Sequence, residues 1–383
     1  MREVECRGVL EIEPKGYGFL RQFSKEFYRH QSDPYVSMAM IRDLGLREGC
    51  LVTGLAKEKG NQVQLHAVHD INGVPPAQYK HVLELTRQTA IAPDKRIRLE
   101  THDPTTRVID LIAPIGRGQR ALIVSPPRSG KTVMMQRMAE AISRNHRDLE
   151  LLLLLVDERP EEVTEMERAV RARVFASSND RDFASHARIA RLTLEYAKRQ
   201  VEVGKDVVIL LDSLTRLGRA FNAGIKGSGR IMSGGIDARA LEIPKRIFGA
   251  SRNIEHGGSL TILATILVDT GSQMDELIFQ EFKGTGNSEI VLDRELADLR
   301  IFPAINIQLS GTRKEELLLG PETELHFKLR RALLEGTNRE AMQGLLDFMR
   351  RFRSNRELLL HIESMRLENV FGSAGPGRRP RRR

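Results

Sequence analysis

Hydrophobic and polar residues follow one pattern in the first 76 residues and another in the rest of the chain. In residues 1–76 the apolar runs are short and are separated by Gly, Pro, Asn and Asp, which is typical of β-strands joined by turns. Short strands spread over about 70 residues predict a small closed barrel of the oligonucleotide-binding (OB) type. The strands predicted in this way cover residues 9–12, 17–21, 35–37 and 51–55.

Farther along the chain, longer apolar runs alternate with helical periodicity. Residues 151–156, 207–211 and 260–268 are almost entirely apolar, as in parallel strands whose two faces are both covered. Segments 183–203 and 274–282 instead repeat apolar residues at helical spacing. This alternation predicts an α/β nucleotide-binding domain.

These patterns divide the chain into four parts. An Asn-Gly-Val-Pro-Pro turn closes the barrel region (1–76), and a mixed, partly helical connector (77–108) leads to the α/β domain (109–371). The last part, residues 372–383, is rich in Gly, Pro and Arg and is expected to be disordered, because such a composition cannot bury a core.

Composition excludes several classes of protein. With 40% hydrophobic and 29% charged residues, the chain is typical of a soluble protein of two or three domains. Its apolar runs are too short to span a membrane, and residues 1–6 lack the apolar core of a signal peptide. Cys6 and Cys50 are too isolated for a zinc site or a disulfide framework. We therefore expect a cytoplasmic protein without a membrane partner.

The formal net charge of +9 does not by itself indicate nucleic-acid binding. Residues 1–76 carry ten basic and ten acidic residues, and five of the excess positive charges lie in the tail. The tail is expected to add only nonspecific attraction to phosphates.

The strongest single motif is Ser-Pro-Pro-Arg-Ser-Gly-Lys-Thr at residues 125–132, between an apolar run (121–124) and a helical segment. A strand, a loop of small residues, Gly-Lys-Thr and a helix together form a cradle for nucleotide phosphates. Lys131 adds a positive charge and Thr132 a hydroxyl for Mg²⁺. Ser125 stands where the usual pattern has Gly, and a chance Gly-Lys-Thr at a surface helix is the alternative. The predicted ATP contacts are Pro127, Arg128, Ser129, Gly130, Lys131, Thr132 and Val133.

Two acidic residues end the predicted strands that should lie near this loop. Glu158 follows the run 151–156 and is a candidate to position or deprotonate the attacking water. Asp212 follows 207–211 and is a candidate to hold Mg²⁺. The alternative for both is an ordinary role at a helix N-terminus. Arg159, beside Glu158, completes the predicted nucleotide contacts on this strand end.

The segment Lys-Gly-Tyr-Gly-Phe-Leu-Arg at residues 15–21 suggests what the barrel does. Strand alternation places Lys15, Tyr17, Phe19 and Arg21 on one face. Two aromatic rings flanked by cations predict a platform on which single-stranded bases stack while the cations meet phosphates. An ordinary strand with exposed aromatics is the alternative. Two Gly-rich stretches, 224–235 and 269–273, are candidates for moving contacts with a polymer.

Taken together, these motifs resemble those of the bacterial transcription termination factor Rho family. The members of this family are hexameric RNA-dependent ATPases and helicases. The resemblance extends from about residue 4 to about residue 370 and implies a cold-shock-like RNA-binding barrel followed by a RecA-like P-loop ATPase domain. The matching segments are 16–21 (GYGFLR), 114–120 (PIGRGQR), 157–166 (DERPEEVTEM), 211–213 (LDS), 283–287 (KGTGN) and 310–317 (SGTRKEEL).

The resemblance implies further roles. Arg313 looks like an arginine finger that reaches the nucleotide of a neighbouring subunit in a homohexameric ring, and Phe302 like a residue that stacks on adenine. The implied cofactors are ATP and Mg²⁺, and the implied partners are single-stranded, pyrimidine-rich RNA and the RNA polymerase elongation complex. The implied RNA contacts are Tyr17, Phe19, Arg21 and Tyr35 in the barrel and Gly229, Arg230, Gly271, Ser272 and Gln273 in the pore loops.

The chain also departs from the family pattern. A helical segment that usually precedes the barrel is missing, Ser125 and Arg128 alter the phosphate loop, and Gln273 replaces the usual Lys of a pore loop. An aromatic residue usual near Gln62 is absent. Two other functions remain as alternatives, a catalytic subunit of a rotary ATPase and a passive RNA-binding protein. Intact Lys131 and Glu158 argue against the second.

Overall fold

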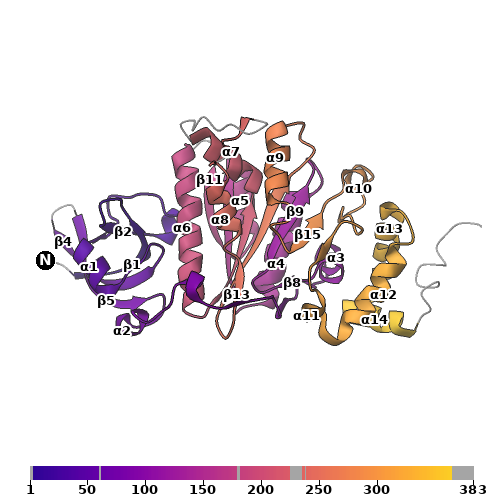
Figure 1. Cartoon of the computed structure of the whole chain (residues 1–383), viewed down its shortest axis with the longest axis horizontal. Coiled ribbons are helices and arrows are strands. Elements are labelled where there is room, and N and C mark those ends of the chain that lie inside the picture. Colours follow the sequence, from indigo (N-terminus) through magenta and orange to yellow (C-terminus); the bar gives the residue numbers. More distant parts are fainter. Residues whose placement is uncertain (1–2, 60–61, 179–181, 225–234, 238, 365–383) are drawn as a thin grey trace, which may run out of the picture.

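The computed structural model describes residues 3–59, 62–178, 182–224, 235–237 and 239–364. Along its long axis a small barrel, a central sheet covered by helices and a group of C-terminal helices follow one another (Figure 1). The predicted RNA contacts Gly229 and Arg230 and the tail 372–383 lie outside the described residues.

Five strands close the N-terminal barrel in the order β1-β2-β3-β5-β4, which confirms the predicted barrel. Its core holds the fully buried Leu10, Leu20 and Leu65. At Gly18 an added Cβ would lie 2.6 Å from the Glu11 carbonyl oxygen, so glycine lets β2 approach β1 closely. The sequence did not predict β5, whose polar residues dilute its apolar pattern. The strands are β1 (Glu3–Ile12), β2 (Gly18–Arg21), β3 (Tyr35–Val36), β4 (Leu51–Lys59) and β5 (Gln62–Ile71), with helices η1 (Phe23–Lys25) and α1 (Met38–Leu44).

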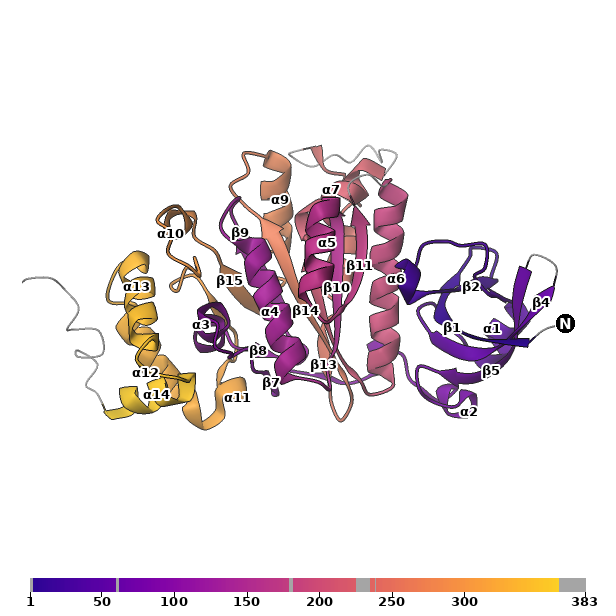
Figure 2. The same ribbon diagram turned by 180° about the vertical axis from the view of Figure 1, so that it is seen from behind.

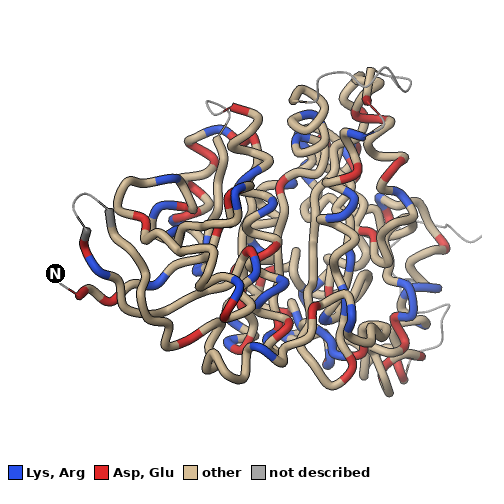
Figure 3. The backbone as a smooth tube through the Cα atoms, turned by 60° about the vertical axis from the view of Figure 1, so that its left-hand side comes forward, with Lys and Arg blue, Asp and Glu red and all other residues tan. Residues whose placement is uncertain are grey.

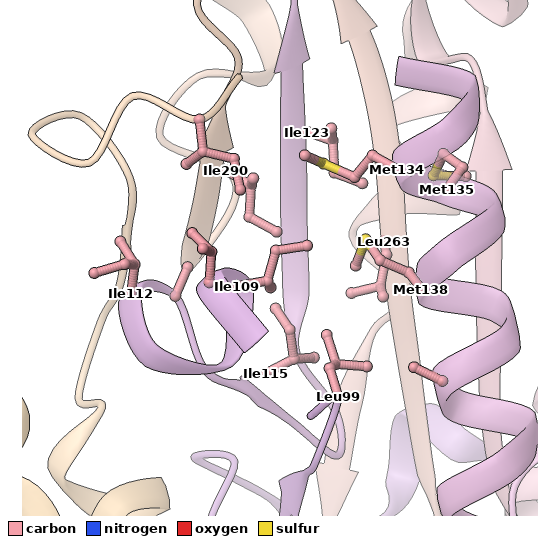
Figure 4. Packing of buried hydrophobic residues seen from close by; sticks show 14 of the residues in the cluster. Leu99, Ile109, Ile112, Ile115, Ile123, Met134, Met135, Met138, Leu263 and Ile290 are labelled. Carbon is pink, nitrogen blue, oxygen red and sulfur yellow. The ribbon is translucent and has the colours of Figure 1, made fainter. Parts of the chain in front are cut away.

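The second half of the predicted connector is built into the α/β domain. Strand β6 pairs with β13 of the large sheet, and β7 pairs with β8. Helix α3 spans the predicted boundary at residue 109, and its Ile109 and Ile112 pack with Leu99 into the core beside β9 (Figure 4). The elements of this region are α2 (Pro76–Tyr79), η2 (Leu85–Arg87), β6 (Ala90–Ile91), β7 (Arg96–Ile97), α3 (Pro104–Ile112) and β8 (Ile115–Gly116).

The large sheet has the strand order β11-β10-β12-β14-β9-β15-β16, and the first six of these strands are parallel. All three predicted apolar strands are present, as β10, β12 and β14. The strands are β9 (Arg120–Ser125), β10 (Glu150–Glu158), β11 (Arg173–Ser178), β12 (Asp206–Asp212), β13 (Arg252–Ile254), β14 (Ser259–Leu267), β15 (Ser288–Val291) and β16 (Gly311–Thr312).

Continuous apolar runs occur because the sheet buries both faces. In β10, Leu151, Leu153 and Leu155 enter the core on one side, whereas Leu152, Leu154 and Val156 enter the core on the other. Helices α7, α8 and α9 lie in front of the sheet in Figure 1, and α4 and α5 lie in front in Figure 2. The helices are α4 (Lys131–Asn145), α5 (Pro160–Ala169), α6 (Phe183–Glu202), α7 (Leu214–Gly224), α8 (Glu242–Phe248), α9 (Gln273–Phe282) and α10 (Arg294–Asp298).

The described part of the chain ends in a group of helices that packs on α3. The Arg107 guanidinium of α3 donates to the Asn355 side chain, with 2.9 Å between Nε and Oδ1. These helices are α11 (Glu316–Leu319), η4 (Gly320–Glu322), α12 (Thr323–Leu333), α13 (Asn338–Met349) and α14 (Asn355–Ser364). Within the described part of the chain, no helix is both long and apolar enough to cross a membrane. Basic and acidic positions are interspersed over the barrel and the sheet domain alike (Figure 3).

Candidate nucleotide and RNA sites

The phosphate loop connects β9 to α4 and is braced from within by two serines. The Ser125 and Ser129 hydroxyl oxygens lie 2.9 Å apart, and Ser129 Oγ also donates to the Pro126 carbonyl at 2.8 Å. Arg128 and Gly130 adopt positive φ values of 64° and 92°, which turn the chain into the first residue of α4. Ser125 stands where the usual pattern has Gly, and its hydroxyl supports the loop through the hydrogen bond with Ser129.

Lys131 begins α4 and lies between two carboxylates from neighbouring strands. Its Nζ is 2.5 Å from Asp212 Oδ1 and 3.5 Å from Glu158 Oε1. Asp212 ends β12 and also accepts from the Thr265 hydroxyl of β14 at 2.7 Å. The structure thus brings together three residues that the sequence predicted separately, at the carboxyl ends of parallel strands where nucleotides bind.

Glu158 has an environment suited to proton transfer. Its side chain is buried, and burial, followed by the nearby Asp212 carboxylate, raises the pKa of Glu158 to about 7. Arg216 of α7 lies 3.2 Å from Glu158 Oε1 and donates to the Asp157 carbonyl. The sequence analysis missed Arg216, although its place four residues after Asp212, at the start of the following helix, was a usable signal.

The residues around the loop differ in exposure. Phe302 is 46% exposed, and its ring atoms come within 3.6 Å of a Cβ built on Gly130, so the ring lies beside the phosphate loop. Val133 is exposed on the first turn of α4, and Arg159 is exposed at the N-cap of α5. An aromatic face beside the loop can stack on a base, as predicted for Phe302.

The oxygen donors at the site suit Mg²⁺. The Thr132 hydroxyl and the Asp212 carboxylate are hard ligands, and Mg²⁺ in nucleotide sites typically uses one or two protein groups together with substrate phosphates. Among the described residues, no three His, Cys, Asp or Glu side chains form a group that could hold a metal ion by themselves. The donor set therefore fits a cation shared with a nucleotide.

Arg313 lies at the other end of the sheet. It follows β16, and its backbone N–H donates to the Asn287 carbonyl at 2.9 Å, next to Ser288, which pairs with Ala121 near the start of β9. The phosphate loop follows Ser125 at the end of that strand. About four residues of strand separate the two levels, or roughly 13 Å. The structure therefore does not bring the exposed Arg313 to the phosphate loop of its own chain.

Three aromatic rings form a cluster on the barrel. The ring centroids of Tyr17, Phe19 and Tyr35 lie 5.6 to 5.9 Å apart, and Phe19 pairs with Tyr35 across β2 and β3. All three side chains are partly exposed. We call this cluster the aromatic platform; its rings are placed as the sequence predicted, with a surface on which bases can stack.

Arg21 requires a correction. It was expected to meet RNA phosphates, yet its side chain is only 3% exposed. Its guanidinium donates to Glu11 Oε2 at 2.6 Å and to Asp33 Oδ2 at 2.7 Å, and its Cζ lies 4.9 Å from the Phe19 ring centroid. Alternation along β2 correctly grouped Arg21 with Phe19, but the carboxylates of Glu11 and Asp33 bury its charge. Arg21 supports the platform from behind.

The second predicted pore loop leads into α9. Gly271 has a φ of 75°, Ser272 caps the helix, and Gln273 is exposed at its start. The buried Asp275 anchors this turn, because its carboxylate accepts from Thr270 Oγ1 at 2.6 Å and from Arg219 Nε of α7 at 2.7 Å. A neutral side chain thus stands at the exposed position where the family pattern usually has a Lys.

Comparison with solved structures supports the fold of the sheet domain. An ATPase from the type III secretion system of pathogenic bacteria has a TM-score of 0.59 at 20% identity, over 74% of this chain and 86% of that one. An ATP synthase subunit from Nanoarcheaum equitans has a TM-score of 0.57 at 16% identity, over 75% and 78%. At these identities the likeness concerns the fold alone, and it agrees with the predicted P-loop ATPase domain.

Comparison with sequence families separates the two parts of the chain. Residues 6–77 match the Rho termination factor RNA-binding domain, and residues 105–312 match the nucleotide-binding domain of the ATP synthase alpha/beta family. A transcription termination factor Rho from Streptomyces lividans is 51% identical over 94% of this chain, which spans 52% of that protein. One from Cereibacter sphaeroides is 49% identical over 93% of this chain and 86% of its own length. The chain belongs to the transcription termination factor Rho family.

Proposed function

We propose that this chain is the subunit of an ATP-driven RNA translocase and helicase that binds nascent single-stranded RNA and terminates transcription. One observation carries the proposal: an exposed aromatic platform and a phosphate loop with Lys131, Glu158 and Asp212 beside it lie in the same chain. Stacked rings tolerate many base sequences, whereas the nucleotide site supplies energy for movement. A passive RNA-binding protein would have no use for the second.

Hydrolysis can be derived from the strand ends. Lys131 binds the phosphates, and Thr132 and Asp212 would hold Mg²⁺, which would neutralise charge on the phosphate oxygens. Glu158, with its pKa near neutrality, accepts the proton of the attacking water. Arg216, beside Glu158, holds the carboxylate in place. Phe302 stacks on the adenine.

A ring completes the site. Arg313 lies toward the opposite end of β9 from its own phosphate loop, so we assign it to the nucleotide of a neighbouring subunit. An arginine finger contributed in this way stabilises the charge that develops on the transferred phosphoryl group. A closed homohexamer gives every nucleotide such a partner. The remaining ATP contacts that we assign are Pro127, Arg128, Ser129, Gly130, Val133 and Arg159.

RNA then follows two contacts. Pyrimidine-rich RNA binds first on the aromatic platform, and the loop 269–273 meets it in the centre of the ring. We also assign RNA contacts to Gly229 and Arg230, which lie outside the described residues. Asp275 accepts hydrogen bonds from Thr270 and from Arg219 of α7, so the loop 269–273 keeps a defined position at the start of α9. Gln273 contacts RNA there without adding a positive charge. The RNA polymerase elongation complex and a cytoplasmic location belong to the same proposal.

The test is ATP turnover with and without pyrimidine-rich RNA, alongside a titration of RNA binding. We expect RNA to be bound and to raise turnover. If ATP turnover does not change when RNA is added, a catalytic subunit of a rotary ATPase, which shares the sheet domain, would be favoured. RNA binding without any turnover would favour a passive RNA-binding protein, and either result would overturn the proposal.

A further inference from the structure

A group of buried ion pairs joins the barrel to helix α6 of the ATPase domain. Its centre is Glu11 of β1, whose Oε2 accepts from Arg21 Nε at 2.6 Å. The same carboxylate receives two bonds from Arg188 of α6, at 2.5 Å to Oε1 and 2.8 Å to Oε2. Arg188 also donates to the Phe27 carbonyl at 2.7 Å. In Figures 1 and 2, α6 is the helix next to the barrel.

The charges of this group balance only across the two domains. From the barrel come one deeply buried cation, Arg21 (3% exposed), and two deeply buried carboxylates, Glu11 (2%) and Asp33 (0%). Glu13, 3.6 Å from Arg21, is paired with the exposed Arg29 near the surface. The barrel therefore carries one excess buried negative charge.

Arg188 of α6, 15% exposed, supplies the missing cation. An unbalanced buried charge is costly, so the pair is strongly favoured. Burial acts to raise the pKa of Glu11, but Arg188 and Arg21 hold it below its usual value. Glu11 is thus an ionised carboxylate that two guanidinium groups share.

The group reaches the RNA surface through one side chain. The Arg21 guanidinium lies behind the Phe19 ring, with 4.9 Å between Cζ and the ring centroid. Phe19 in turn contacts Tyr17 and Tyr35. Without Arg188, Arg21 is the only cation of this group left to balance the charges of two buried carboxylates, Glu11 and Asp33. Arg21 and the ring in front of it then lose their fixed position.

We propose that Arg188 of the ATPase domain is a positioning residue for RNA binding, because it balances Glu11 and so holds Arg21 behind the aromatic platform. The inference rests on the platform being the RNA site, as proposed above. The barrel's RNA site is then complete only when the barrel is docked on α6. RNA affinity and domain docking are consequently linked, since whatever weakens one weakens the other.

The test measures binding of a fluorescein-labelled oligocytidylate RNA to the full chain without nucleotide. We expect Arg188→Gln to weaken binding about tenfold, within the range for residues that share one ion-pair network. Glu11→Gln added to Arg188→Gln should restore most of the affinity, because the neutral pair needs no cation. Arg188→Lys, which keeps the charge, should bind better than Arg188→Gln.

Arg191→Gln is the matched control. Arg191 lies one turn farther along α6 and pairs with the barrel's Glu48 at 3.2 Å, but that pair does not contact Arg21. We expect its RNA affinity to change less than about twofold, because the Arg191 side chain is 48% exposed and solvent screens its pair with the half-buried Glu48. If Arg191→Gln weakens binding as much as Arg188→Gln, or if the double substitution restores nothing, the positioning role is wrong.

Phe19→Ala separates this inference from the proposal on which it rests. Loss of affinity in Phe19→Ala with normal affinity in Arg188→Gln would leave the platform in place and refute the role of Arg188. Normal affinity in Phe19→Ala would refute the platform itself. Thermal unfolding of each variant shows whether the chain is folded. Should Arg188→Gln not fold, Arg188→Lys and the double substitution still decide the outcome.

Discussion

The side chains of the nucleotide site and those of the aromatic platform are held in position in different ways. At the nucleotide site, Lys131 contacts both Glu158 and Asp212, and the ends of parallel strands fix the positions of the two carboxylates. On the platform, the exposed rings contact one another, but their support is a buried ion group that extends into a second domain. The first site is organised by its backbone and the second by charges behind its surface.

This difference says where each site is vulnerable. In our proposal the nucleotide site lacks only the arginine finger of another subunit, since Arg313 lies away from the loop of its own chain. If Arg188 has the positioning role that we propose, a substitution on α6, away from the RNA-binding surface, weakens the platform. If both proposals hold, each site is incomplete in isolation, the first without a neighbouring subunit and the second without its own ATPase domain.

The largest effect should come from Arg313→Ala. The variant should still bind ATP and assemble, but its turnover should fall by about 10³–10⁵, the range for loss of an arginine finger. Steady-state hydrolysis at saturating ATP measures the loss. Lys314→Ala, which removes the next exposed cation, serves as the control and should keep most of its activity.

Mixing then locates the finger. When Arg313→Ala and Glu158→Ala subunits are combined, a junction where the intact acid of one meets the intact finger of the other should restore some turnover. Subunit exchange must be shown independently by fluorescence. If exchange is shown and turnover is still absent at every mixing ratio, Arg313 acts within its own chain. The nucleotide site would then need no second subunit and would differ less from the platform.

Lys131→Ala tests whether the two regions are separable. Removing the phosphate-binding charge should lower ATP turnover by on the order of 10²–10³, as for loss of one preorganised donor. RNA affinity measured without nucleotide should remain close to that of the unaltered chain, because the platform lies in the barrel. Equal losses of turnover and RNA affinity would mean that the regions are not independent.

Phe19→Ala makes the converse test. Loss of one stacking ring should weaken RNA binding by about 1–3 kcal/mol, without changing ATP affinity in the absence of RNA. Phe302→Ala is a matched aromatic control with the opposite expectation, a weaker affinity for ATP and an unchanged affinity for RNA. If a filter-binding titration finds both variants equal to the unaltered chain in RNA affinity, the platform does not bind RNA.

The same contrast explains what could be predicted from the sequence. Lys131 and Asp212 were predictable because each follows an apolar strand, and parallel strands bring their ends to one edge of a sheet. Strand alternation placed Phe19 and Arg21 on one face, but it could not show that Glu11 and Asp33 cover the Arg21 charge. The contact between Glu11 and Arg188 joins residues 177 positions apart, and no local pattern marks it.

The fold shows a similar limit. The parallel strands were predicted because a sheet buried on both faces demands continuous apolar runs. The start of the ATPase domain was placed inside α3, since a helix whose residues complete a core does not differ in sequence from a connecting helix. Only the packing of Ile109 and Ile112 beside β9 shows where this segment belongs (Figure 4).

The smallest predicted effect is a pH dependence that should be confined to the nucleotide site. Burial and the neighbouring Asp212 carboxylate raise the pKa of Glu158 to about 7, so below that pH the protonated carboxyl cannot accept a proton from water. The kcat/KM for ATP should therefore rise about tenfold between about pH 6 and pH 8, following the ionised fraction, and level off above it. RNA affinity should stay flat over the same range, because stacking of bases on the aromatic platform does not depend on the ionisation of Glu158. In Glu158→Gln, the residual kcat/KM for ATP should no longer rise with pH. A rise that persists in Glu158→Gln would assign the titration to another group and remove Glu158 as the base.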